Sequence, residues 1–155
     1  MYKEYKIGDV SDLVPELKED FPEAQLKGDD ILRLHSEFFE GFSEGSKLLT
    51  VRFKPGFIRY PCNSEMNEKN RLGLYETKPD DEDYCERVGN ILIPKMAAGN
   101  FQDFPEEIAI KDGYSGKSEL RDVLNEIYEP IYGRQVEDED FLSAYFFGEF
   151  SPNHF

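Results

Sequence analysis

Tryptophan is absent from this 155-residue sequence, and cysteine and histidine occur only twice each. Cys62 and Cys85 belong to no Cys-x-x-Cys pair or Cys/His cluster, which excludes the common sequence patterns of zinc sites and redox-active thiol pairs. We therefore expect two ordinary reduced thiols and a protein that binds no metal or other cofactor.

Long apolar runs are also missing. No segment approaches the roughly 20 apolar residues that a membrane-spanning helix needs. The first six residues, Met-Tyr-Lys-Glu-Tyr-Lys, lack the apolar run of a secretory signal. These two absences predict a cytoplasmic protein with no membrane partner.

Basic residues are few, because 18 Lys and Arg stand against 33 Asp and Glu, a formal net charge of -15. Such a charge disfavours broad attraction to phosphate backbones, so any contact with nucleic acid must be local. The acidity is typical of a surface that keeps a small protein soluble. It also leaves open a protein partner that recognises an acidic surface.

Aromatic residues, by contrast, are abundant, with 13 Phe and 9 Tyr. A chain of this length buries roughly two-thirds of its unfolded surface when it folds as one domain. We expect an aromatic-rich core that needs neither a metal nor a disulfide to hold it together.

Apolar spacing and turn residues predict the elements of secondary structure. The expected helices cover residues 12–21, a stretch from a cap at Asp29 or Asp30 to about Phe42, residues 105–111, and a stretch from a cap at Ser118 to Tyr128. The expected strands cover residues 47–53, continuing to about 60 after a break at Pro55-Gly56, and residues 71–77, 84–95 and 141–150. Gly89-Asn90 indicates a bulge or a hairpin turn.

Helices therefore interrupt the strands without a regular alternation, and no repeat or low-complexity linker divides the chain. This order favours an α+β fold, built as a small β-barrel of about five or six strands with flanking helices. His35 lies on the apolar stripe of the second helix, where we interpret it as a structural histidine rather than a catalyst.

The segment Gly45–Arg52, Gly-Ser-Lys-Leu-Leu-Thr-Val-Arg, is the candidate site. Thr50 and Arg52 are two residues apart, so they lie on the same face of a strand. Lys47 is three residues from Thr50 and joins that face only if it lies in a turn before the strand begins. Gly45 permits such a turn.

This Gly-x-Lys-x-x-Thr-x-Arg spacing after a helix resembles the ASCH superfamily, small barrels related to the PUA fold. The resemblance extends to Asp112–Ser115, to the helix that follows and to the final aromatic strand. It covers roughly residues 29–150. Residues 1–28 then become an amino-terminal extension with a short helix, and residues 151–155, which include His154, a tail.

The resemblance implies a cleft for a modified nucleoside or single-stranded RNA. Some similar small ASCH proteins hydrolyse the acetyl amide of N4-acetylcytidine with a Lys, a Thr and a Glu. Lys47 and Thr50 match the first two, and Asp112, one methylene shorter than Glu, takes the acidic position. The residues expected to bind the ligand are Gly45, Ser46 and Arg52.

In this chemistry Thr50 is the nucleophile and Lys47 is the base that accepts its proton. An exposed lysine has a pKa of about 10.4, so Lys47 needs burial or a nearby cation such as Arg52. Asp112 favours the charged lysine, so we expect it to orient the amine or to handle the proton of the leaving group. Glu106 and Glu107 are nearby substitutes for Asp112.

Other uses of the same residues stay open. Arg52 can bind a phosphate or a base carbonyl through its planar fork, which describes a non-catalytic RNA- or nucleotide-binding module. Some ASCH proteins are linked to RNA cleavage, which implies an RNA-processing activity. A further class is a partner-binding protein that uses its acidic surface and residues 1–28.

Overall fold

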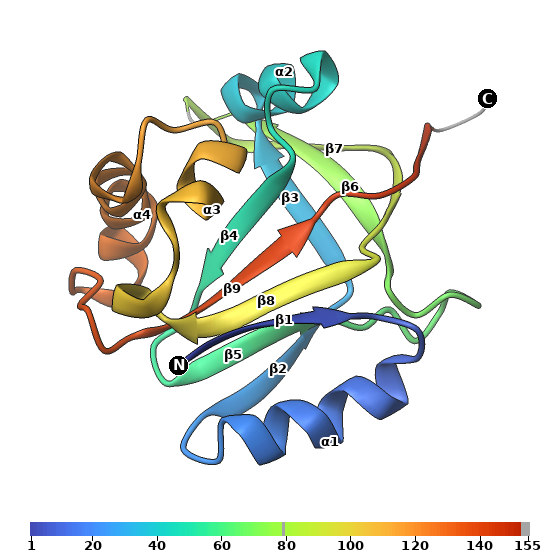
Figure 1. The fold of residues 1–155 in the computed structure, drawn as a ribbon. Coiled ribbons are helices and arrows are strands. Elements are labelled where there is room, and N and C mark those ends of the chain that lie inside the picture. The colour runs from blue at the N-terminus through green and yellow to red at the C-terminus, as the bar shows by residue number, and fades with distance from the viewer. Residues whose placement is uncertain (79, 153–155) are drawn as a thin grey trace.

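Ten strands and four α-helices occur in residues 1–78 and 80–152, the residues that this computed structural model describes (Figure 1). The strands are β1 (Tyr2–Lys6), β2 (Gln25–Asp29), β3 (Ile31–His35), β4 (Leu49–Phe53), β5 (Phe57–Pro61), β6 (Arg71–Lys78), β7 (Asp81–Leu92), β8 (Lys95–Asn100), β9 (Phe141–Phe146) and β10 (Phe150–Pro152). The helices are α1 (Val10–Asp20), α2 (Ser36–Glu44), α3 (Glu106–Lys111) and α4 (Lys117–Tyr132), with a 3₁₀ turn at Phe101–Asp103. None of these helices is long and apolar enough to cross a membrane.

The strands form three sheets, with the orders β1-β8-β9-β4, β10-β7-β6-β3 and β2-β5. The pairs β2–β5 and β3–β6 are parallel, and the others are antiparallel. The α+β prediction is confirmed, but the expected number of strands is too low. Within the described ranges the strand pairings leave each sheet open at its ends, so a closed barrel stays a prediction.

Strand β9 separates two hydrophobic clusters. Its residues Leu142 and Ala144 pack with β4, α3 and α4 on one side, and Tyr145 packs with α1 and the other sheets on the opposite side. All three side chains are fully buried. Figure 1 shows the same arrangement, with α3 and α4 on one flank of the β8–β9–β4 sheet and α1 on another. The predicted strand over 141–150 is confirmed only to Phe146.

The first 28 residues are built into the fold. Strand β1 pairs with β8, and β2 pairs with β5. The predicted helix over 12–21 is confirmed as α1, which begins earlier, at Val10, behind a cap by Asp9. Pro15 therefore falls in its second turn, where it removes one backbone hydrogen bond. Leu13 and Leu17 of this helix pack into the hydrophobic cluster that contains Tyr145, so α1 is part of the core.

The predicted second helix is wrong before Ser36. The chain there forms β3, which pairs in parallel with β6. Leu32 and Leu34 are buried and Arg33 is exposed, so these residues satisfy the alternation of a strand as well as the stripe of a helix. Helix α2 ends as predicted, because Gly45 has a φ of 79°, the left-handed conformation that closes helices.

Several boundaries differ from the predictions. Gly116, rather than Ser118, is the residue before α4, and α4 continues beyond Tyr128. The predicted strand over 84–95 begins earlier, as β7, and ends before a separate strand β8. The register shifts beside Gly89, which fits the predicted bulge rather than a hairpin turn. Ser151 and Pro152 belong to β10, and the rest of the expected tail, with His154, lies outside the described residues.

Candidate functional site

A cavity of about 810 Å³, which we name the central cavity, lies where β3, β4 and β5 meet α4. Its lining also includes residues of β2, of the adjoining ends of β6 and β7, and of the segment after α3. Helix α4 supplies an apolar wall whose residues recur at helical spacing: Leu120, Val123, Leu124, Ile127, Tyr128 and Ile131.

The charged lining of the central cavity differs from the rest of the protein. Six of the 18 basic residues line it, namely Lys27, Arg33, Lys47, Arg52, Arg59 and Lys78. Among the residues whose side chains are described, only four acidic ones do so, namely Asp29, Asp30, Asp81 and Asp112. The described lining therefore has a positive excess on a chain whose net charge is -15.

The turn before β4 places Lys47 as the spacing predicts. Gly45 closes α2, and the backbone N–H groups of Ser46 and Lys47 both donate to the carbonyl of Gly41, at 3.0 Å. Lys47 therefore precedes the strand, which starts at Leu49. Gly45 and Ser46 shape this turn outside the cavity lining, and their contact with a ligand stays a prediction.

Thr50 and Arg52 share one face of β4. They pair with Tyr145 and Ser143 of β9, while Leu49, Val51 and Phe53 pack in the cluster on the other side of the sheet. Thr50 is only 5% exposed, and both Thr50 and Arg52 line the central cavity.

Lys47 and Asp112 form a buried ion pair. The Lys47 ammonium also donates to the backbone carbonyl of Asp112 at 3.3 Å. The neighbouring backbone is joined as well, because Leu48 donates to the carbonyl of Lys111 at 2.8 Å. The end of α3 is thereby held against the start of β4, which brings Asp112 to the motif over 60 residues away in the sequence.

Burial shapes the acid–base properties of this pair. It lowers the pKa of Lys47, and nearby Arg52 lowers it further, although Asp112 acts in the opposite direction. Burial raises the pKa of Asp112 to about 6, against the opposing effects of Lys47, Arg52 and a hydrogen bond from the Val51 backbone. Both charged forms are therefore disfavoured relative to groups in water.

The two glutamates that could substitute for Asp112 lie elsewhere. Glu106 accepts a hydrogen bond from the backbone of Lys117 at 2.7 Å, and Glu107 pairs with Lys111. Both are exposed and neither belongs to the cavity lining. Among the candidate acids, Asp112 is the one beside Lys47.

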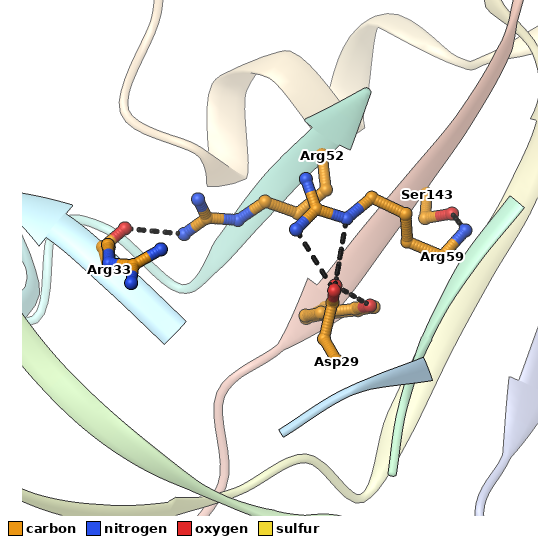
Figure 2. Close-up of polar contacts among 6 residues, drawn as sticks. Asp29, Arg33, Arg52, Arg59 and Ser143 are labelled. Carbon is orange, nitrogen blue, oxygen red and sulfur yellow. Dashed lines mark hydrogen bonds and ion pairs between the residues drawn. The ribbon is translucent and has the colours of Figure 1, made fainter. Parts of the chain in front are cut away.

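A second polar cluster in the central cavity was not predicted from the sequence. Arg59 donates through Nε and Nη2 to the buried Asp29 carboxylate at 2.9 and 3.0 Å, and the Tyr145 hydroxyl donates to the same carboxylate at 2.7 Å. Figure 2 shows Arg59 directed at Asp29, and Arg52 reaching from β4 to the backbone of Arg33 in β3. The only signal for Asp29 was its predicted role as a helix cap, which is wrong.

His35 is the last residue of β3 rather than part of a helix, and its interpretation as a structural histidine stays a prediction. Its Nδ1 lies 3.0 Å from the hydroxyl of Thr77, and both residues line the central cavity. In the described part of the chain, no group of three or more His, Cys, Asp or Glu residues is arranged to hold a metal ion. Cys62 and Cys85 are both free thiols.

Comparison with known proteins gave matches among solved structures. No family model matches the sequence, and no curated protein does. The chain is similar to the crystal structure of ASCH from Zymomonas mobilis, at 16% identity over 79% of this chain and 68% of that one, with a TM-score of 0.49. It is also similar to an ASCH domain from Lactobacillus crispatus, at 12% identity over 93% and 92% of the two chains, with a TM-score of 0.44.

Both are ASCH structures. They belong to the family that the Gly45–Arg52 motif resembles. Any activity depends on the residues of the central cavity itself.

Those residues combine two chemical abilities. Thr50 contributes a hydroxyl to the same cavity as the buried Lys47–Asp112 pair, and acyl transfer uses a hydroxyl, an amine and a carboxylic acid of this kind. The arginines of the cavity can donate hydrogen bonds to oxygen acceptors and attract anions, which are the properties that nucleotide binding requires.

Proposed function

We propose that the central cavity binds a modified pyrimidine nucleoside and hydrolyses an acyl amide on it, of the N4-acetylcytidine type. The observation that supports this most is that the buried Lys47–Asp112 pair and Thr50 line the same cavity of about 810 Å³. That volume falls within the usual range of small-molecule sites, roughly 300–1,000 Å³.

In the proposed reaction, the Thr50 hydroxyl attacks the amide carbonyl while Lys47, as the neutral amine, accepts the hydroxyl proton. The C–N bond then breaks, and the leaving amine nitrogen takes a proton from Lys47. Water cleaves the resulting ester of Thr50 and releases the carboxylic acid. Asp112 orients the Lys47 amine and exchanges a proton with it during these steps.

Burial favours this assignment of the base. A lysine in water is protonated at neutral pH, whereas burial and the charge of Arg52 lower the pKa of Lys47. The Asp112 carboxylate opposes this shift, and because its own pKa is raised to about 6, its opposing charge is lost as the pH falls through 6. The neutral amine that the mechanism needs is therefore more accessible here than on the protein surface.

The test is incubation of the folded protein with N4-acetylcytidine, followed by chromatography of cytidine and acetate. Lys47→Ala and Thr50→Ala should each lower the rate at least about 100-fold, the usual contribution of a base or nucleophile. Lys18→Ala, at an exposed residue of α1, should keep the full rate. Absence of turnover by the folded wild type would exclude the hydrolytic proposal for this substrate.

A second candidate function is non-catalytic binding of RNA or a nucleotide. The buried Nε of Arg52 has no hydrogen-bond partner among the described residues, and a ligand oxygen would supply one. Binding of cytidine or a short RNA without any hydrolysis or RNA cleavage, together with its loss in Arg52→Ala, would favour this function.

A further inference from the structure

Arg52 lies between the two polar clusters of the central cavity. It acts electrostatically on Lys47 and Asp112 at one end and on Tyr145, the partner of Asp29, at the other. A ligand that reaches Thr50 therefore also comes close to Arg52, which lies two residues along the same strand face, about 7 Å away.

The charge of Arg52 has no anionic partner in the described residues. Its Nη2 donates to the neutral carbonyl of Arg33 at 2.9 Å, and its Nε is buried without a partner. No described carboxylate lies within the 4.0 Å of an ion pair from Arg52 or from Arg33. Because unpaired buried donors and charges are costly, such groups point to a missing anionic acceptor.

Arg59 provides the contrast within the same cavity. Asp29 engages two of its nitrogens and neutralises its charge. Asp29 also accepts from Tyr145, so this carboxylate is fully occupied. Arg33 of β3 and Arg52 of β4, which also line the cavity, have no such carboxylate partner among the described residues and can meet a ligand.

Helix α4 gives the cavity an apolar wall. This wall includes Ile131, which is 64% exposed and so is accessible to a ligand. A cavity with an apolar wall and two guanidinium groups that have no described carboxylate partner suits a ligand with a flat, weakly polar body and one anionic group. A nucleobase and a phosphate have these properties.

We propose that Arg33 and Arg52 form a phosphate subsite, so that the ligand of the central cavity is a nucleoside phosphate rather than a neutral nucleoside. The Nε–H of Arg52 and the guanidinium of Arg33 donate to the phosphate oxygens. This inference rests on the proposed nucleoside cleft and names its substrate class more closely.

The test compares cytidine with cytidine 5′-monophosphate by isothermal titration calorimetry. Neither ligand carries an acyl amide, so the result is independent of hydrolysis. We expect the monophosphate to bind the wild type roughly 10-fold or more tightly than cytidine, the effect of charge-assisted bonds. Equal affinity for the two ligands in the wild type would overturn the inference.

The variants Arg33→Gln and Arg52→Gln should reduce this ratio to about 1, while Lys18→Gln, which removes the same charge from exposed α1, should keep it. Arg33→Gln is the safer variant for folding, because its side chain is exposed and Arg52 bonds only to its backbone carbonyl. Circular dichroism checks the fold of each variant. A preserved preference for the monophosphate in both arginine variants would also overturn the inference.

The source of the phosphate is distinguished by the dinucleotide CpC, which has a phosphodiester and no terminal phosphate. Binding of CpC like the monophosphate, and equally sensitive to Arg52→Gln, assigns the subsite to an RNA backbone. Binding of CpC like cytidine assigns it to a mononucleotide. If N4-acetylcytidine is not hydrolysed while the phosphate preference is found, the hydrolytic proposal fails and the subsite stands.

Discussion

Asp112 and Lys47 are each held in surroundings that favour the form without charge, yet each is the other's partner. Removing one of them leaves the other charged group buried, which is costly in most proteins. A change in the protonation of this pair should therefore alter both the stability of the protein and the proposed catalysis. The positive charge of nearby Arg52 lowers the pKa values of both groups.

The stability of the protein should depend on pH through Asp112. Its pKa is raised to about 6 in the folded protein, so the folded state binds this proton more tightly than the unfolded chain, whose carboxyl has a pKa near 3.9. The resulting stabilisation is complete below the unfolded pKa and is lost as the pH rises through about 6. We expect the free energy of unfolding of the wild type, relative to Asp112→Asn, to fall between about pH 4 and about pH 7.

Urea denaturation at a series of pH values measures this difference. Asp122→Asn is the matched control, because Asp122 is exposed on α4, and its profile should run parallel to that of the wild type. Parallel profiles for the wild type and Asp112→Asn would contradict the prediction.

At the level of strands, the Asp29 carboxylate joins three elements. It stands at the end of β2, binds Arg59 of β5 and accepts from Tyr145 of β9. The Ser143 hydroxyl, also of β9, accepts from the backbone N–H of Arg59 at 2.9 Å. These bonds fasten the small β2–β5 sheet to the sheet that holds Thr50.

Tyr145→Phe should therefore destabilise the protein while keeping its shape. It removes a hydrogen bond to a buried carboxylate, a change of about 2 kcal/mol in the free energy of unfolding. Tyr84→Phe is the control, because it removes a similar bond to Glu86 on the surface and should change stability by less than about 0.5 kcal/mol. Equal effects of the two substitutions in urea denaturation would contradict this role of Tyr145.

The spacing of residues predicted the structural features that depend on neighbouring residues. It missed those that depend on contacts between segments far apart in the sequence. The common face of Thr50 and Arg52 follows from strand alternation, and the turn at Gly45 follows from glycine chemistry. The residues of β3 fit both a helical stripe and a strand, and only pairing with β6 decides between them. Asp29 and Arg59 lie 30 residues apart in the sequence, and no local pattern connects them.

For the molecule as a whole, the net charge determines how strongly the surface attracts or repels nucleic acid. The net charge of -15 repels a polyanion, whereas the described lining of the central cavity has more basic than acidic residues. Contacts with RNA beyond the nucleotides in the cavity should therefore add no affinity.

Lengthening a single-stranded RNA should leave its affinity per site unchanged. We expect a 20-nucleotide RNA to bind no more tightly than a dinucleotide once its affinity is divided by the number of dinucleotide positions, with a slope of log affinity against log salt no steeper than about -1.4, the value for two phosphate contacts. Fluorescence anisotropy measures both quantities, and Arg52→Ala should weaken binding at every length. A steep rise of affinity with RNA length would contradict a single, local site.

The place of β9 between β8 and β4 has a consequence for how the protein matures on the ribosome. Thr50 and Arg52 belong to a strand whose only described sheet partner is β9, about 90 residues later in the chain. Strand β9 also contributes buried residues to both hydrophobic clusters. During synthesis, we therefore expect β4 to pair only after residues 141–146 have left the exit tunnel, and until then it is an unpaired apolar strand that a chaperone would recognise.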